Sequence, residues 1–305
     1  MTLTRREWLA ATAVAGIVPP VPAAPTPAVI DTHTHFYDPT RPGGVPWPGK
    51  DDKVLYRPVL PAEYRKMAAP LGVTGTVVVE ASPLVEDNQW LLDLAKDEPF
   101  LLGIVGRLIP TDADFAKNLD RFAKNPLFRG IRNAHAEVKK ALADDAVLKN
   151  LARLAEKDLA LDVNGGPELL ADVAKLAAKL PKLRIVVNHM ANPTIDGKKA
   201  AEEYVANLKA AARPNVWCKL SALVEGSRKR GAAPKDLDFY RQTADAVWNA
   251  FGADRVVFGS NWPVSDHYAS FDTVFSLAKR YLTEKGAADK VFGANAVAAY
   301  KLTRK

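Results

Sequence analysis

The stretch VIDTHTHFYDP, residues 29–39, carries the strongest indication of fold and function in this chain. A short apolar segment leads into Asp31, and two histidines, His33 and His35, follow with one residue between them. This alternate spacing places both imidazoles on the same side of an extended chain. The chain has only five histidines among 305 residues. A pair at the end of one predicted strand therefore indicates a site with a chemical task.

Seven further short apolar runs follow this first strand, and most are continuous, as is typical of parallel strands buried on both faces. The predicted strands lie at 29–31, 75–81, 100–108, 128–134, 160–165, 184–190, 215–223 and 255–264. Amphipathic stretches such as 112–125 and 168–180 separate them, with apolar residues three and four apart. Eight strands alternating with helices predict an α/β fold, the (β/α)8 TIM barrel. The alternative is an open doubly wound sheet, which usually has a glycine-rich phosphate turn where this chain has HTH.

Composition and charge narrow the classes of partner. The net charge of +7 comes from lysines spread along predicted helices, without an arginine-rich or aromatic-interleaved patch, so we expect no nucleic acid partner. Cys218 is the only cysteine, which excludes an intramolecular disulfide and a cysteine metal cluster. No run reaches the roughly 18 apolar residues of a stable membrane span. A small-molecule substrate is the expected partner, and the oligomeric state stays open.

Residues 1–24 have the layout of a cleavable signal peptide. Arg5 and Arg6 precede an apolar run from Trp8 to Val18, and small residues follow. The TRREWL segment resembles a twin-arginine export signal, with an ordinary secretory signal as the alternative. We therefore expect a periplasmic or secreted protein whose TIM-barrel domain covers residues 25–305.

Polar residues from several predicted strands are expected at one mouth of the barrel, because the carboxyl ends of its strands converge there. His189 follows the sixth strand, and Asn261 follows the start of the eighth. Arg132 leaves the fourth strand, Lys219 lies on the seventh, and Glu80 ends the second. Together with the first-strand histidines, these residues predict a catalytic pocket.

With these residues, the chain resembles the amidohydrolase-related family of TIM-barrel hydrolases. The resemblance is to the branch of sugar-acid lactonases and 2-pyrone-4,6-dicarboxylate lactonase. It rests on stretches in family order: IDTHTHFYDP, TGTVVVEAS, NQWLLDLA, LLGIVGRL, FRGIR, VVNHMANP, VWCKLSAL and RVVFGSNWPV. It implies a hydrolase that opens a lactone or a related cyclic ester or amide of a small polar or anionic substrate. Two alternatives remain, a metal-dependent decarboxylase and a non-catalytic periplasmic binder.

One position departs from the family pattern. Hydrolytic members generally read GSDWP on the eighth strand, and that aspartate is the implied general base, whereas this chain reads GSNWP with Asn261. An amide cannot accept a proton at neutral pH. Asp266 and Glu80 are the candidate replacements, with His189 as the next.

A metal site is one of two open possibilities. His33, His35 and His189 are candidate ligands for one divalent cation such as zinc or manganese, with a position left for water. The predicted fourth and fifth strands offer no bridging lysine, so one metal is the upper limit. The resemblance also implies relatives that work without metal, in which the histidines polarise the carbonyl directly.

Three further residues are candidates for binding the substrate. Arg132 matches the family arginine and is expected to hold a carboxylate with two parallel hydrogen bonds. Lys219 is a candidate for neutralising an oxyanion. Trp262 is a candidate for stacking on a ring, with core packing as the alternative.

Overall fold

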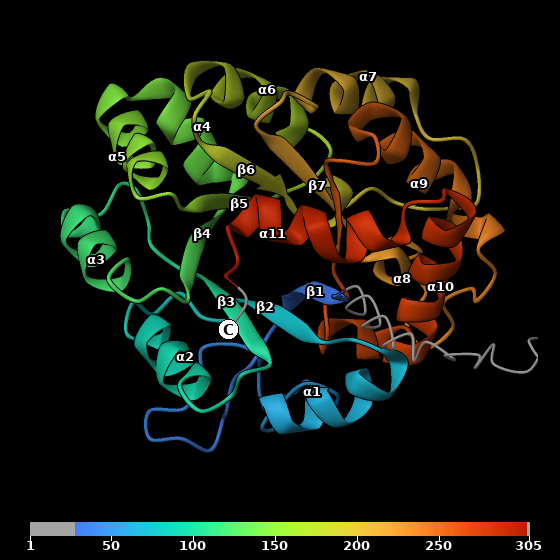
Figure 1. Cartoon of the computed structure of the whole chain (residues 1–305), viewed down its shortest axis with the longest axis horizontal. Coiled ribbons are helices and arrows are strands. Elements are labelled where there is room, and N and C mark those ends of the chain that lie inside the picture. Colours follow the sequence, from blue (N-terminus) through green and yellow to red (C-terminus); the bar gives the residue numbers. More distant parts are fainter. Residues whose placement is uncertain (1–27, 304–305) are drawn as a thin grey trace, which may run out of the picture.

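The computed structural model of the protein describes residues 28–303, in which eight parallel strands form a barrel with helices around it (Figure 1). Neighbours in the sheet follow chain order from β1 to β8. The strands are β1 Ile30–Thr34, β2 Gly75–Val79, β3 Leu101–Gly106, β4 Phe128–Ala134, β5 Ala160–Asn164, β6 Arg184–Val187, β7 Val216–Leu220 and β8 Val256–Phe258. All eight predicted strands are confirmed, and the predicted TIM barrel with them.

Helices follow the strands and cover the outside of the sheet (Figure 1). They are α1 Pro61–Ala68, α2 Asp87–Ala95, α3 Phe115–Phe122, α4 His135–Ala143, α5 Asp145–Glu156, α6 Leu169–Lys179, α7 Glu202–Ala211, α8 Leu223–Gly226, α9 Asp238–Phe251, α10 Phe271–Glu284 and α11 Asn295–Tyr300. Within residues 28–303, no helix is long and apolar enough to cross a membrane. The predicted signal peptide lies outside the described residues.

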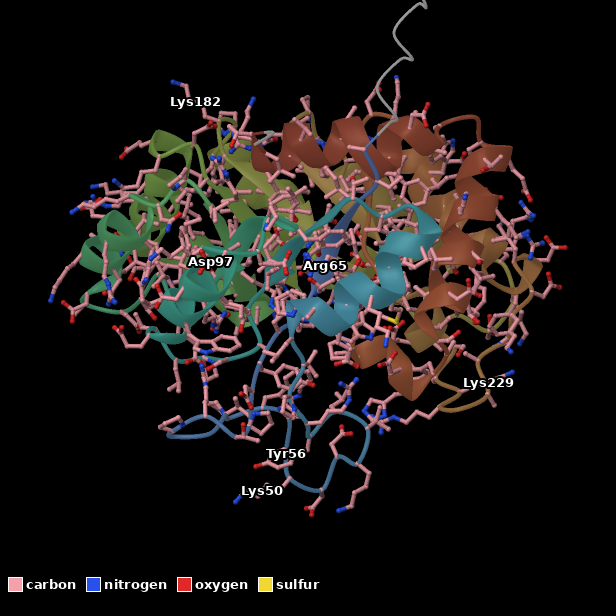
Figure 2. The ribbon with its side chains drawn as sticks, turned by 60° about the horizontal axis from the view of Figure 1, so that its bottom comes forward. Lys50, Tyr56, Arg65, Asp97, Lys182 and Lys229 are labelled. Atoms are coloured by element: carbon pink, nitrogen blue, oxygen red, sulfur yellow. The ribbon has the colours of Figure 1, made fainter. Side chains whose placement is uncertain are left out.

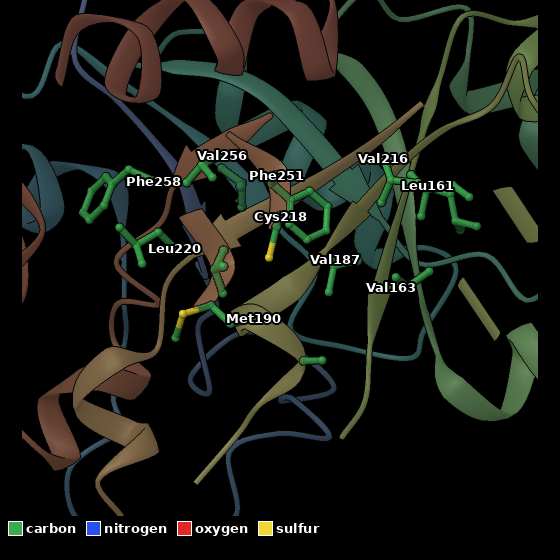
Figure 3. Packing of buried hydrophobic residues seen from close by; sticks show 14 of the residues in the cluster. Leu161, Val163, Val187, Met190, Val216, Cys218, Leu220, Phe251, Val256 and Phe258 are labelled. Atoms are coloured by element: carbon green, nitrogen blue, oxygen red, sulfur yellow. The ribbon is translucent and has the colours of Figure 1, made fainter. Parts of the chain in front are cut away.

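Side chains point alternately outward and inward along each strand, so they pack into two different cores. The outward-facing residues of β5 to β8, such as Val187, Cys218 and Phe258, pack with helix residues such as Phe251 of α9 (Figure 3). The inward-facing residues, among them Val186 and Val257, form a smaller inner core. Helix α11 contributes to this inner core and lies across the barrel near β5 and β7 (Figure 1). The same alternation turns the polar residues Asp162 of β5 and Lys219 of β7 inward.

Asp31 joins the two ends of the sheet. Its Oδ1 accepts from the backbone N–H of Ser260 at 2.9 Å and of His33 at 3.0 Å, and its Oδ2 accepts from the Tyr64 hydroxyl at 2.7 Å. The backbone N–H of Asn261 donates to the carbonyl of His33 at 2.9 Å on the same seam. Burial raises the pKa of Asp31. This carboxyl therefore links β1, the segment after β8 and α1 at the place where the barrel closes.

We predict that Asp31→Ala destabilises the protein by about 3 kcal/mol or more, because it leaves several buried donors without an acceptor. Urea denaturation of the full-length protein measures the loss. Asp51→Ala, at an exposed loop position, is the matched control and should change stability by less than about 0.5 kcal/mol. Equal stability of the two variants would contradict the role given to Asp31.

Candidate active site

A pocket of about 570 Å³ lies at the carboxyl ends of the strands, and every strand or the residues just after it contributes to its wall. The side chains that carry chemistry are His35, Glu80, Arg132, His189, Glu225 and Asn261. The predicted convergence on one mouth is thus observed for five residues of the predicted set. Glu225 is an addition that the sequence reasoning missed.

A buried ion pair between Lys219 and Asp162 lies inside the barrel, and both side chains are fully excluded from solvent. Lys219 Nζ lies 2.7 Å from Asp162 Oδ2, donates to the carbonyl of Thr32 at 2.8 Å and lies 3.1 Å from His33 Nδ1. These three acceptors match the three N–H groups of an ammonium. Lys219 is absent from the pocket wall. The structure therefore places Lys219 in a buried ion pair and not on the wall that a substrate oxyanion would contact.

The hydrogen bonds of the histidines fix two of their tautomers. Because Nδ1 of His33 accepts from Lys219, the ring proton of His33 sits on Nε2. Nδ1 of His35 lies 2.9 Å from the carbonyl of Val79 and must donate, which leaves a lone pair on Nε2. Burial lowers the pKa of His35 to about 3. Burial, followed by the charge of Lys219, lowers the pKa of His33 and His189 well below the ordinary value. All three imidazoles are neutral at neutral pH.

Left-handed backbone follows the last three strands and aims their residues inward. His189, Ala222 and Asn261 have φ angles of 53°, 54° and 60°. Such conformations are uncommon for residues other than glycine and concentrate at functional sites. The ring of His189 is held at Nδ1, 2.9 Å from the hydroxyl oxygen of Ser221. The three strand ends are thus shaped for the pocket at some cost in backbone strain.

Glu225 of α8 pairs with Asn261 inside the pocket. Asn261 Nδ2 donates to Glu225 Oε1 at 2.9 Å, and both side chains are buried. Burial raises the pKa of Glu225 to about 7. The predicted seventh strand runs through residue 223, two residues before Glu225, so Glu225 is not among the predicted site residues. An acidic residue five positions after the true end of β7 was the available signal.

Arg132 and Glu80 form a second pair on the wall. The Arg132 Nε donates to Glu80 Oε1 at 2.9 Å, and its Nη2 donates to the backbone carbonyl of Glu80 at 2.8 Å. This pair already uses two of the three guanidinium nitrogens. The predicted double hydrogen bond to a substrate carboxylate therefore needs the opposite edge of the guanidinium, where Nη1 and the second N–H of Nη2 are unused in the described chain. The remaining nitrogen, Nη1, has no hydrogen-bond partner among residues 28–303.

Trp262 and Asp266 do not line the pocket. Trp262 is 1% exposed and packs against Phe36 and Tyr64, with ring centroids 6.1 Å and 5.4 Å away. Its predicted stacking on a substrate ring is therefore wrong, and the core-packing alternative holds. Asp266 Oδ2 lies 3.6 Å from Arg57 Nη2. Its predicted entry into the mouth is not observed.

The loop after β1, residues 38–52, forms part of the mouth of the pocket. Trp47 lines the pocket, with its ring centroid 6.0 Å from that of His35. Asp52 Oδ2 lies 2.9 Å from Nε2 of His267, which also lines the pocket. Figure 2 shows Lys50 of this loop and the nearby Tyr56 at the bottom of the view, and Lys229 at its lower right. The loop is thus fastened across the mouth to the residues after β8.

The histidines do not fit the predicted metal site. A metal held by the three histidines needs one lone pair from each of them at the same point. Nε2 of His33 carries a proton and has no lone pair to offer. This nitrogen is buried without a hydrogen-bond partner in the described chain. Among residues 28–303, no group of three His, Cys, Asp or Glu residues is placed to hold a metal ion. The ammonium of Lys219 beside His33 also opposes a cation there.

Comparisons with known proteins give one consistent result. The profile of the family described as amidohydrolase matches residues 30–302. An L-fucono-1,5-lactonase of Burkholderia ambifaria is 34% identical over 284 residues, covering 90% of this chain and 96% of that protein. A second L-fucono-1,5-lactonase, from Burkholderia multivorans, is 31% identical, again over 90% of this chain and 96% of that protein.

Solved structures agree in fold. A crystal structure of an amidohydrolase from Burkholderia multivorans with bound zinc has a TM-score of 0.81 and 28% identity. It covers 90% of this chain and 100% of that one. A putative 2-pyrone-4,6-dicarboxylic acid hydrolase from Pseudomonas putida has a TM-score of 0.70 at 22% identity. It covers 90% of this chain and 98% of that one, and it supports the fold alone.

We predict that the protein, dialysed against a chelator and then mixed with equimolar zinc, retains less than one zinc per chain. The reason is the protonated Nε2 of His33, and the measurement is metal content by mass spectrometry after desalting. His135→Ala serves as a control, because His135 lies off the pocket, 2.9 Å from Asp172. One zinc per chain that is lost in His35→Ala and kept in His135→Ala would contradict the metal-free interpretation.

Proposed function

Since this chain belongs to the amidohydrolase family and is a lactone hydrolase, we propose that its substrate is the 1,5-lactone of a sugar acid. The observation that carries the proposal is the 34% identity to an L-fucono-1,5-lactonase across 90% of this chain and 96% of that protein. The pocket of about 570 Å³ has room for one sugar ring, and its polar wall suits a ring with several hydroxyl groups. The relatives named lactonases argue against the decarboxylase and the non-catalytic binder.

The residues supply hydrogen bonds to a polarised carbonyl without a metal step. Nη1 of Arg132 is a free donor on the wall. The hydroxyl of Ser221 can donate to Nδ1 of His189, which leaves the proton of His189 on Nε2 as a second donor. Such donors stabilise the oxyanion that forms when water adds to the lactone carbon. The side chains of Asn164 and Asn192, which also line the pocket, offer donors and acceptors for ring hydroxyls.

The direct test is a screen of sugar 1,5-lactones and pyrone carboxylates, with acid release followed at neutral pH. We predict hydrolysis of at least one sugar 1,5-lactone and no dependence of its rate on added zinc or manganese. Arg132→Lys keeps a positive charge beside Glu80 but removes the planar guanidinium. It should lower kcat and kcat/KM by about 10- to 150-fold, the worth of one hydrogen bond with a charged partner, because this bond forms to the oxyanion.

Arg121→Lys is the matched control for that variant, because Arg121 pairs with Glu86 on the surface. It should leave KM and kcat within about twofold of the wild type. A wild type that hydrolyses pyrone carboxylates alone would contradict the sugar substrate, and silence toward every lactone would overturn the proposed function.

We also propose that the protein is exported through the twin-arginine route to the periplasm, on the basis of Arg5 and Arg6 before the apolar run. Replacing both arginines by lysine should retain the protein in the cytoplasm, because that pathway reads the arginine pair. Cell fractionation and immunoblotting measure this, with Lys209→Arg as a control. Periplasmic delivery of the double variant would contradict the proposal.

A further inference from the structure

We propose that Glu225 is the general base that activates water in this pocket, in place of the aspartate that the family pattern has at position 261. The inference rests on the proposed lactone hydrolysis and names the proton acceptor that this reaction requires. It differs from the expectation drawn from the sequence, which placed the base at Asp266, Glu80 or His189.

The position of Glu225 suits this task. It follows β7 through the left-handed Ala222 and lines the same pocket as His189. The side-chain amide of Asn261 holds Oε1 at 2.9 Å. The second oxygen, Oε2, is buried and has no hydrogen-bond partner within residues 28–303. One oxygen is thus fixed by an amide donor, and the other keeps its lone pairs for the proton of a water molecule.

The surroundings match the basicity of Glu225 to neutral pH. The pKa of Glu225 is raised to about 7, and burial is the largest cause. The hydrogen bond from Asn261 and the charge of Arg228 lower this pKa, whereas the charge of Asp266 raises it. The hydroxyl-bearing Tyr240 of α9 also faces this carboxyl. A general base works best when its pKa lies near the working pH, since it is then both ionised and basic enough.

The other two candidate carboxylates are engaged elsewhere. Glu80 accepts from Nε of Arg132 and also holds that guanidinium with its backbone carbonyl. Asp266 does not line the pocket and lies beside Arg57. Of the three carboxylates, Glu225 is thus the one without an ion pair in the described part of the chain, and its Oε2 is buried without a hydrogen-bond partner.

The reaction balances with this single acceptor. Glu225 takes a proton from water as the water oxygen bonds to the lactone carbonyl carbon, and a tetrahedral oxyanion forms. When the oxyanion collapses, the bond between the carbonyl carbon and the ring oxygen breaks. The protonated Glu225 returns its proton to that oxygen, which becomes the hydroxyl of the product. The new carboxylic acid then loses its own proton to solvent.

The test compares kcat/KM of the wild type and Glu225→Gln between about pH 5 and 9 on the lactone that the wild type hydrolyses. Glutamine keeps the shape and can still accept from Asn261, so the fold should persist. We expect a fall in kcat of about 10²- to 10⁴-fold. In the wild type, kcat/KM should decline tenfold per pH unit below about 7, and this decline should vanish in the variant. Glu284→Gln, at a surface pair with Arg241, is the matched control.

An exchange variant separates chemistry from structure. Glu225→Gln combined with Asn261→Asp swaps the carboxylate and the amide while keeping both groups in the pocket. It should recover about tenfold or more of the lost rate. The inference alone would be overturned if the wild type is active, the kcat of Glu225→Gln lies within about tenfold of the wild-type value, and the decline at acidic pH is retained. The same holds if Asp266→Asn removes the decline, whereas a wild type silent on every lactone overturns the proposed function and the inference with it.

Discussion

The buried pair of Lys219 and Asp162 is the interaction on which the pocket depends. Both charges are fully removed from water, which is costly unless every donor and acceptor is satisfied. Asp162 also accepts from Asn188 and from Tyr300 of α11, at 2.9 Å in both cases. The pair thereby connects β1, β5, β6, β7 and the helix that closes the inner core. Its ammonium also places the proton of His33 and helps keep the neighbouring imidazoles neutral.

Burial lowers the pKa of the three histidines, which makes them weak proton acceptors, so the reaction needs a carboxylate to take the proton of water. The family pattern supplies that group from the residue after β8, where this chain has Asn261. Here the acid comes instead from α8, after the neighbouring strand, and the amide holds it in place at 2.9 Å. Adjacent strands of a barrel end at one mouth. A functional group supplied from one strand end can therefore occupy the same place as a group supplied from the next.

The sequence predicted the strands well, because continuous apolar runs and their alternation depend on local periodicity. It also brought His35, His189, Asn261, Arg132 and Glu80 to one mouth, since barrel geometry alone requires that. It could not rank Lys219 and Trp262 correctly, because their burial depends on Asp162, Phe36 and Tyr64 from distant parts of the chain. Glu225 was missed because the true end of β7 lies three residues before the predicted one, and the left-handed turn at Ala222 leaves no pattern in sequence.

The pocket thus combines neutral histidines with one carboxyl that titrates near neutrality. The most direct measurement is the carboxyl ¹³C chemical shift of the protein labelled at glutamate side chains, followed across pH and assigned with Glu225→Gln. We predict one glutamate resonance with a midpoint at about 7 that is missing in the variant. A Glu225 carboxyl that is already fully ionised at about pH 5, near the ordinary range of glutamate, would contradict it.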